Sequence, residues 1–381
     1  MSKSLALFVV SASIGFSGLN CTGVPVATNS PEIDSDLGES VWPGEAAATQ
    51  SIAELISRAV EKKYPPGKRP ARRDAHPKAH GCVRARFAVD AHLPENLAQG
   101  AFVPGKTYDA WIRFSNGNSD PARADIKGDA RGMAIKLMGV PGVKLLPVES
   151  AAETQDFIMI NHPVFFIDDP QDYLKLIKRG ESSNPLVKAT APLALGVKGA
   201  LIARAISQKK IENPLFTRFW SMVPYRLGDD AHKQAIKFSA KPCIAHPNDR
   251  IPENPDADYL RKAMANTLAA GDACFDFLVQ PRLSASMKVE DSKTEWKESE
   301  APFIKVATIT IPTQTFDSPE QMAFCENLSF TPWHSLPEHR PLGGVNRVRR
   351  TVYEQISRVR HDLNQAPRKE PTGTETFLRP H

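Results

Sequence analysis

The sequence predicts an α+β protein, an antiparallel eight-stranded β-barrel with helices inserted between the strands and packed outside them. Two observations favour this class. Segments typical of strands come first, a helical stretch follows, and further strands precede a last helix. No internal repeat is visible in the chain. A barrel of this size can hold a ligand, so the predicted fold is compatible with a binding function.

The composition indicates a globular chain without a nucleic-acid partner. The chain has 381 residues, of which 41% are hydrophobic, enough for a substantial core. Its net charge of +5 is too small and too evenly spread to indicate nucleic-acid binding. The five cysteines are odd in number and include no C-x-x-C pair, so neither a disulfide framework nor a zinc site is predicted.

The N-terminal residues 1–27 resemble a secretory signal peptide, in which one lysine precedes an apolar run and then small residues. The run at residues 5–16 is too short to span a bilayer. We therefore expect an exported protein, periplasmic or extracellular, in preference to a cytoplasmic one. Residues 28–47 are expected to form a linker, residues 48–364 the folded domain and residues 365–381 a flexible tail.

Strands are predicted where apolar and polar residues alternate, at residues 81–90 and 108–117. The apolar side chains that share a face in these two strands are Val83, Ala85, Phe87 and Val89, then Tyr108, Ala110, Ile112 and Phe114. In the second strand, Arg113 and Ser115 share the opposite face. Further strands are expected in the longer apolar runs at residues 131–140, 155–167, 274–283 and 302–316.

Helical periodicity accounts for most of the remaining chain. The predicted helices cover residues 50–63, 169–180, 184–210 (as two helices), 254–271 and 347–361. In the last of these, Arg349, Tyr353, Ser357 and Arg360 form one stripe, because positions four and seven apart share a helix face. Taken alone, this pattern is also typical of an amphipathic surface helix with solvated arginines.

Three other groups of polar residues are candidates for a site. His76 and His80 are four apart and could ligate a metal on a helix, but Pro77 argues against a helix there, so two turn histidines are favoured. Ser115 could form a hydrogen bond with an imidazole. Asn161 comes just before the apolar run at residues 163–167, where it could line a cavity or face water at the end of a strand.

Six short motifs occur in order along the chain. They are R-x-x-H-x-K from Arg73 through His76 to Lys78, R-F-S at 113–115, D-x-R-G-x-A-x-K at 129–136, P-V-F-F-I-x-D at 163–169, F-W-S at 219–221 and R-x-x-x-Y at Arg349 and Tyr353. The catalase superfamily has these motifs in the same order, and the chain resembles its smaller, catalase-related haem peroxidases. The resemblance extends from about Arg73 to His361.

The resemblance implies a catalase-like barrel that encloses haem b. The iron ligand of the family is a tyrosine, which corresponds to Tyr353. A free phenol has a pKa of about 10 and is a poor ligand, so the positive charge of Arg349 one turn earlier would stabilise the phenolate. Arg73 and Arg360 are suited to the haem propionates. The resemblance also assigns Arg113 and Phe166 to the cofactor pocket.

On the opposite side of the haem, the resemblance implies a histidine that moves a proton between the two peroxide oxygens. His76 matches this position and Ser115 matches the hydroxyl that holds its ring. His80 is the alternative acid/base. The family also has an asparagine here, and the candidate is Asn161. Counting without a gap gives Ile160 instead, and a strand residue that is off by one faces the other way.

The predicted function is therefore haem-dependent metabolism of peroxides, either dismutation of hydrogen peroxide or peroxidation of an organic donor. Two alternatives remain. One is a fatty-acid hydroperoxide isomerase of the allene oxide synthase kind, for which the apolar residues 192–206 could form a lid that faces lipid. The other is a non-catalytic barrel that binds haem or lipid. The expected partners are a peroxide substrate, an organic or lipid co-substrate and further copies of the chain in a homo-oligomer.

Overall fold

The computed structural model describes residues 33–245 and 249–377, and every structural statement below concerns these residues. The predicted signal peptide and the start of the predicted linker lie outside them. Within the described range, one compact unit begins at Ile33.

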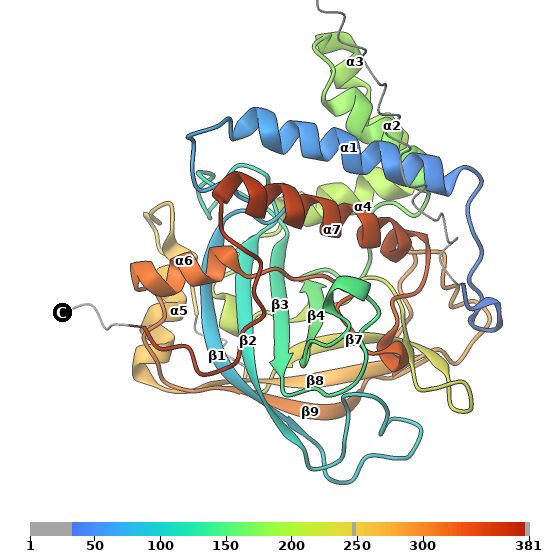
Figure 1. Ribbon diagram of the computed structural model, residues 1–381, viewed down its shortest axis with the longest axis vertical. Coiled ribbons are helices and arrows are strands. Elements are labelled where there is room, and N and C mark those ends of the chain that lie inside the picture. Colours follow the sequence, from blue (N-terminus) through green and yellow to red (C-terminus); the bar gives the residue numbers. More distant parts are fainter. Residues whose placement is uncertain (1–32, 246–248, 378–381) are drawn as a thin grey trace, which may run out of the picture. The chain divides into compact units, whose positions relative to one another are not determined.

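An antiparallel β-barrel forms the centre of this unit (Figure 1). Its strands are β1 (Ala79–Val89), β2 (Thr107–Asn116), β3 (Arg131–Met138), β4 (Thr154–Ile160), β5 (Phe219–Trp220), β6 (Tyr225–Leu227), β7 (Gln234–Pro242), β8 (Ala273–Pro281) and β9 (Ile304–Ile311). The order in the nine-stranded sheet is β5-β4-β3-β2-β1-β9-β8-β7-β6, and β5 also pairs with β7. This pairing leaves β6 outside a closed ring of the other eight strands, which confirms the predicted fold class.

The strands predicted from the sequence agree with the structure to within a few residues, with two differences. The apolar run at 155–167 ends as a strand at Ile160, where the chain turns ahead of Pro163. β5, β6 and β7 are not predicted. β5 and β6 have two and three residues, too few to show a pattern. β7 alternates as clearly as the predicted strands, since Ile236 and Phe238 are buried in the core.

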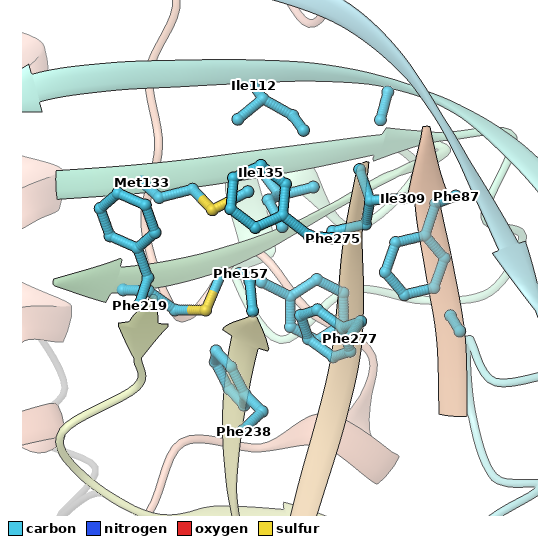
Figure 2. Close-up of a cluster of buried hydrophobic side chains, with 14 of the residues drawn as sticks. Phe87, Ile112, Met133, Ile135, Phe157, Phe219, Phe238, Phe275, Phe277 and Ile309 are labelled. Carbon is cyan, nitrogen blue, oxygen red and sulfur yellow. The ribbon is translucent and has the colours of Figure 1, made fainter. Parts of the chain in front are cut away.

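The interior of the barrel is filled by packed aromatic and aliphatic side chains (Figure 2). The rings of Phe157 and Phe277 lie 5.0 Å apart and those of Phe87 and Phe277 lie 5.1 Å apart, the spacing of well-packed aromatic pairs. The predicted inward faces of β1 and β2 belong to this core. A ligand as large as a macrocycle therefore has to bind against the outside of the barrel wall.

Helices pack against the outside of the barrel. They are α1 (Glu45–Lys63), α2 (Pro170–Gly180), α3 (Pro185–Ala189), α4 (Gly196–Gln208), α5 (Tyr259–Ala270), α6 (Pro319–Asn327) and α7 (Gly344–Asn364), with short 3-10 helices at Ser35–Leu37, Pro147–Glu149, Ala191–Leu195, Pro214–Phe216 and Pro337–His339. α1, α4 and α7 lie on the same side of the barrel (Figure 1). Ile52 and Ile56 of α1 belong to one buried cluster with Val348 and Ile356 of α7.

The described part of the predicted linker, residues 33–47, is instead part of the fold. Glu39 and Glu45 are both buried and both pair with Arg347 of α7, at 2.8 and 2.6 Å. Buried carboxylates need such partners, and the partner is about 300 residues away in the chain. A polar, Pro-rich composition therefore gave no indication of the docking.

The predicted flexible tail is also docked, over residues 365–377. Glu370 accepts a 2.6 Å ion pair from the buried Lys136 on β3. Further along, the Trp111 indole donates to Glu375 at 3.1 Å, and the rings of Phe377 and Trp111 lie 5.9 Å apart. The tail satisfies a buried lysine and covers a buried tryptophan, so these residues belong to the domain.

Two disulfides correct the expectation that the cysteines form no framework. Cys82 of β1 is bonded to Cys325 of α6, and Cys243 is bonded to Cys274 of β8. Cys21 lies outside the described residues. The first pair is separated by 243 residues in the sequence, so no local spacing could reveal it.

We expect Glu370→Gln to lower the free energy of unfolding by on the order of 1–3 kcal/mol near neutral pH, since Lys136 loses an ionic partner. Burial opposes ionisation of Glu370, but Lys136 and His334 lower its pKa from 4.5 to about 2. A lowered carboxyl pKa contributes stability that is present above the unfolded pKa and is lost as the pH falls through the folded one. Urea unfolding at several pH values should therefore show a difference between wild type and variant that is complete above pH 4.5 and disappears towards pH 2. A difference that grows on acidification would contradict this ion pair.

Candidate functional site

A cavity of about 490 Å³ lies between the barrel wall and α7, in the size range of ligand sites. Its floor comes from strands β2, β3 and β4. The register of these strands aligns Arg113 with Ala134 and Ile158, and directly opposite residues in antiparallel strands point to the same side. The next aligned row is Ser115, Gly132 and Ile160, and both rows line the cavity. Arg113 and Ser115 alternate with Phe114 of the filled core, so the floor is mainly the outer face of the wall.

The stripe predicted on the last helix faces this cavity. Arg349, Tyr353, Ser357 and Arg360 of α7 all line it. Arg349 donates a hydrogen bond from Nη2 to the Tyr353 hydroxyl at 3.2 Å. Burial disfavours the charge on Arg349, but the neighbouring phenols, Tyr353 foremost, outweigh it and raise the pKa of Arg349. A positive group therefore lies beside the Tyr353 oxygen.

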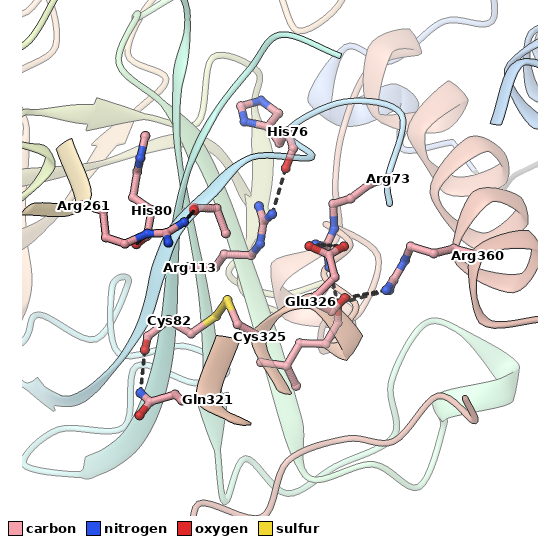
Figure 3. Close-up of a disulfide and its surroundings, with 12 residues drawn as sticks. Arg73, His76, His80, Cys82, Arg113, Arg261, Gln321, Cys325, Glu326 and Arg360 are labelled. Atoms are coloured by element: carbon pink, nitrogen blue, oxygen red, sulfur yellow. Dashed lines mark hydrogen bonds and ion pairs between the residues drawn. A yellow bond between two sulfur atoms is a disulfide. The ribbon is translucent and has the colours of Figure 1, made fainter. Parts of the chain in front are cut away.

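Three arginines gather at one side of the cavity, from three separate segments (Figure 3). They are Arg73, Arg113 of β2 and Arg360 of α7, and Glu326 accepts from Arg73 at 3.2 Å. Burial, followed by the charge of Arg73, lowers the pKa of Arg113 well below its usual value and that of Arg360 to about 9. Arg113 Nε is buried without a hydrogen-bond partner. The cluster thus has more buried positive charge than its protein partners neutralise, as expected of a site for an anionic group.

His76 also lines the cavity, next to Arg113. Its Nδ1 and Ser115 Oγ share a hydrogen bond of 3.0 Å, and Arg113 donates to the His76 carbonyl at 2.8 Å (Figure 3). The His76 backbone has a φ of 59°, a left-handed conformation that is strained in residues other than glycine and is often found at functional sites. Burial, and then the charge of Arg113, lowers the pKa of His76 to about 3, so its imidazole is neutral and able to accept a proton.

His80 does not line the cavity, although it is only four residues from His76. Its Nε2 shares a 2.8 Å hydrogen bond with Asn116 Oδ1 in a buried polar network on the other side of the chain. The structure therefore brings His76 to the cavity and leaves His80 outside, and the two do not form a metal pair. Among the described residues, the group with metal-ligand spacing is Glu149, His334 and Glu370. It lies away from the cavity, and Lys136 and Arg368 neutralise its carboxylates.

The structure does not bring Asn161 into the cavity. The Asn161 side chain accepts a 2.7 Å hydrogen bond from the Arg131 backbone N–H, and the residue follows directly after β4. Ile160, one position earlier, lines the cavity in its place. No bulge reverses the strand there, because β4 keeps its register with β3 up to Ile160. The wall next to His76 is thus apolar where an amide was expected.

The outer wall of the cavity is apolar, with two titratable residues that the sequence analysis missed. Phe165 and Phe166 pack with their rings 4.3 Å apart and both line the cavity. Asp74 and, on α2, Tyr173 also line the cavity, and burial raises the pKa of both side chains. Asp74 occupies one of the two unspecified positions between Arg73 and His76 in the R-x-x-H motif. Its place between two candidate site residues was the signal that could have identified it.

Gly132 leaves the space that the His76 ring occupies. A Cβ added there would lie 2.6 Å from His76 Nδ1 and 2.8 Å from Ser115 Oγ, closer than such atoms approach. We expect Gly132→Ala to remain folded but to slow any turnover that depends on the His76 imidazole by roughly tenfold or more, because small displacements of a catalytic group are costly. Gly180→Ala is the control, since its Cβ would meet nothing within 4 Å. Equal turnover by the two variants would contradict the tight packing around His76.

Comparison with known proteins gives a consistent assignment. A family model described as Catalase matches residues 66–190. A catalase-related peroxidase of Mycolicibacterium paratuberculosis (strain ATCC BAA-968 / K-10) is 26% identical over 220 residues, which cover 57% of this chain and 67% of that protein. The residues that the family model matches include the segments that contribute His76, Arg113 and Ser115 to the cavity.

Solved catalases share the fold. A fungal catalase aligns with a TM-score of 0.61 at 19% identity, over 84% of this chain and 65% of its own. Catalase A from Saccharomyces cerevisiae gives 0.60 at 18% identity, over 84% and 67%. A bacterial catalase gives 0.59 at 16% identity, over 98% and 74%. The chain thus spans about two thirds of the length of the first two. With the family model matched at residues 66–190, these similarities show a chain with the catalase fold that is similar in sequence to catalases over that segment.

Proposed function

We propose that this protein is a haem-dependent oxidoreductase that reduces peroxides, with haem b held in the cavity and Tyr353 as the ligand of its iron. The observation that carries the proposal is that one cavity combines a Tyr353–Arg349 pair, a neutral His76 and a cluster of buried arginines. A bound haem would need an iron ligand, a proton carrier for the peroxide and cations for its propionates, and these three groups would supply them in that order.

The residues present fit such a cofactor. Arg73, Arg113 and Arg360 supply the positive charge that two propionates would neutralise, and the unpartnered Arg113 Nε is a donor for one of them. The walls between the tyrosine and the histidine are apolar, which suits a macrocycle. Arg349 places a positive charge beside the Tyr353 oxygen, where a phenolate bound to ferric iron would carry its negative charge.

In the proposed reaction, the haem supplies the oxidation–reduction chemistry at the peroxide O–O bond. His76 accepts the proton of one peroxide oxygen and returns it to the other, because its imidazole is neutral at physiological pH. Ser115 holds the ring in place through its hydrogen bond to Nδ1, which leaves Nε2 as the atom that exchanges the proton. Phe165 and Phe166 exclude water from that side.

Peroxidation of an organic donor is favoured over dismutation. Ile160 occupies the cavity wall where the family has an amide, so that amide is not there to orient hydrogen peroxide. The second candidate function is isomerisation of a fatty-acid hydroperoxide, which the apolar outer wall with Phe165, Phe166 and Ile206 favours.

Parallel assays of the purified protein with haem distinguish these functions. Dye oxidation without release of oxygen from hydrogen peroxide supports a peroxidase, and oxygen release supports dismutation. Rearrangement of a fatty-acid hydroperoxide without an electron donor supports the isomerase. A haem spectrum that no peroxide perturbs would reduce the function to binding and would refute the proposal.

We also propose that the protein is exported. The Cys82–Cys325 and Cys243–Cys274 disulfides support this, because structural disulfides persist in oxidising compartments. Fractionation of expressing cells, with mass spectrometry of the mature N-terminus, should find the chain outside the cytoplasm and shortened by about the first 27 residues. Full-length chain in the cytoplasm would contradict the proposal.

A further inference from the structure

An unusual concentration of exposed apolar side chains lies on residues 185–208, which we call the arm. It consists of α3, the 3-10 helix Ala191–Leu195 and α4. Five of its large aliphatic side chains are exposed: Leu186 (78%), Val187 (40%), Leu193 (73%), Val197 (81%) and Leu201 (63%). Exposed apolar side chains at this density, which we call the patch, normally contact something else.

The charged residues of the arm itself have a single sign. From Ser182 to Ile211 the sequence contains no aspartate or glutamate. The same stretch carries Lys188, Lys198, Arg204, Lys209 and Lys210, and all five are exposed. Apolar side chains among exposed basic residues are typical of helices that lie in the interface of an anionic bilayer.

The arm is long and apolar enough to cross a membrane by length and composition alone, but its structure argues for a position on the surface. It is broken into short pieces, and α4, with 13 residues, is about 20 Å long against the roughly 30 Å of a bilayer core. Its inner side is attached to the protein. A Cβ on Gly199 would collide with the Phe166 carbonyl oxygen, and Ala203 and Ile206 line the cavity.

We propose that the arm docks the protein on the surface of an anionic phospholipid bilayer. Leu193, Val197 and Leu201 enter the acyl boundary, while the basic residues contact the head groups. Because Ala203 and Ile206 of the same helix line the cavity, docking sets the outer wall of the cavity against the membrane. Membrane docking uses the outer surface of the arm and does not depend on a bound cofactor.

Vesicle co-sedimentation with the full chain tests the proposal. We expect the wild-type protein to bind vesicles of equal parts phosphatidylcholine and phosphatidylglycerol, to bind phosphatidylcholine alone weakly, and to release as salt rises. The triple variant Leu193→Ser, Val197→Ser and Leu201→Ser should lose at least about tenfold in affinity for the anionic vesicles. The matched control is Val143→Ser with Val148→Ser, which removes aliphatic side chains that are 71% and 74% exposed elsewhere on the protein.

The charge contribution is tested separately with Lys188→Gln, Lys209→Gln and Lys210→Gln. This variant should lose at least about tenfold in affinity for anionic vesicles, and its binding should depend much less on salt. Thermal unfolding should match wild type for every variant, since all the substituted side chains are exposed. If the triple serine variant fails to fold, a fluorophore that is sensitive to polarity, attached at Val197→Cys, replaces it. Its emission should shift to the blue with anionic vesicles, while the same label at Val148→Cys should not respond.

Three results would overturn the proposal. The first is no binding of wild type to anionic vesicles. The second is equal binding by the triple serine variant and the Val143/Val148 control. The third is a wild-type protein that is a dimer by sedimentation velocity and does not bind vesicles, together with a triple serine variant that is a monomer. The arm would then be a contact between copies. None of these measurements uses peroxide turnover, so failure here is distinct from failure of the proposed enzyme function.

Discussion

Replacing Tyr353 by phenylalanine is expected to remove most of the haem from the protein. The substitution keeps the ring that packs in the cavity and deletes the one oxygen that Arg349 contacts at 3.2 Å. Haem would then be held by the arginine cluster and the apolar walls alone, without a bond to its iron. The measurement is the haem content and the absorption spectrum of wild type and variant purified side by side from haem-supplied cells.

Tyr173→Phe is the matched control for this experiment. Tyr173 is also a partly buried phenol that lines the cavity, but it lies on α2 and has no arginine partner comparable to Arg349. We expect this variant to keep both the haem and its spectrum. An unchanged spectrum in Tyr353→Phe, or loss of haem in Tyr173→Phe alone, would move the ligand away from α7.

The second large effect is expected for His76→Ala, which should keep haem and slow peroxide turnover by roughly two orders of magnitude or more, the usual contribution of a positioned general acid/base. No other imidazole lines the described cavity. The Ser115 hydroxyl points at the vacated space but is too weak a base to replace the ring. Stopped-flow kinetics with peroxide, alongside the haem spectrum, separates loss of the proton carrier from loss of the cofactor.

His162→Ala is the histidine control. The His162 ring is half-buried, shares a 3.0 Å hydrogen bond with the Val164 carbonyl and does not line the cavity. This variant should turn over peroxide within a fewfold of wild type. If His76→Ala were as fast as the control, the proton would have to move through another group, and Asp74, with its raised pKa, would be the next candidate.

The parts of the site that lie on a regular element could be predicted from the sequence. The stripe of Arg349, Tyr353 and Arg360 follows from helical spacing alone, and α7 presents it to one cavity. The shared face of Arg113 and Ser115 follows from strand alternation in the same way. A period of 3.6 or 2 residues is a local property, so the relative direction of such side chains needs no tertiary information.

The parts that depend on distant contacts could not be predicted. The pairing of Lys136 with Glu370 and the bond between Cys82 and Cys325 join segments more than 200 residues apart. Local composition therefore made the C-terminal tail resemble a disordered segment. From the sequence alone, a flexible linker or tail cannot be distinguished from a docked segment, because the distant partners of its charged residues are not known.

Asn161 shows a third limit, because it follows the end of a strand. Whether that residue or Ile160 faces the cavity depends on one register position, and the sequence motif allowed both. The location of the cavity was equally hidden. The aromatic residues that fill the barrel interior, such as Phe157 and Phe277, alternate correctly for a barrel, but alternation alone does not say which side of the wall holds the ligand.

The central claim is that the Tyr353 phenolate binds the iron of a haem whose propionates meet the three arginines. Resonance Raman spectroscopy of the wild-type protein reconstituted with haemin tests this claim most directly, because it detects the vibrations of a phenolate only when the oxygen is bonded to the metal. We predict uptake of haemin together with phenolate ring vibrations enhanced alongside the haem bands. A protein that takes up no haemin, or one whose haem spectrum lacks phenolate vibrations, would contradict the account.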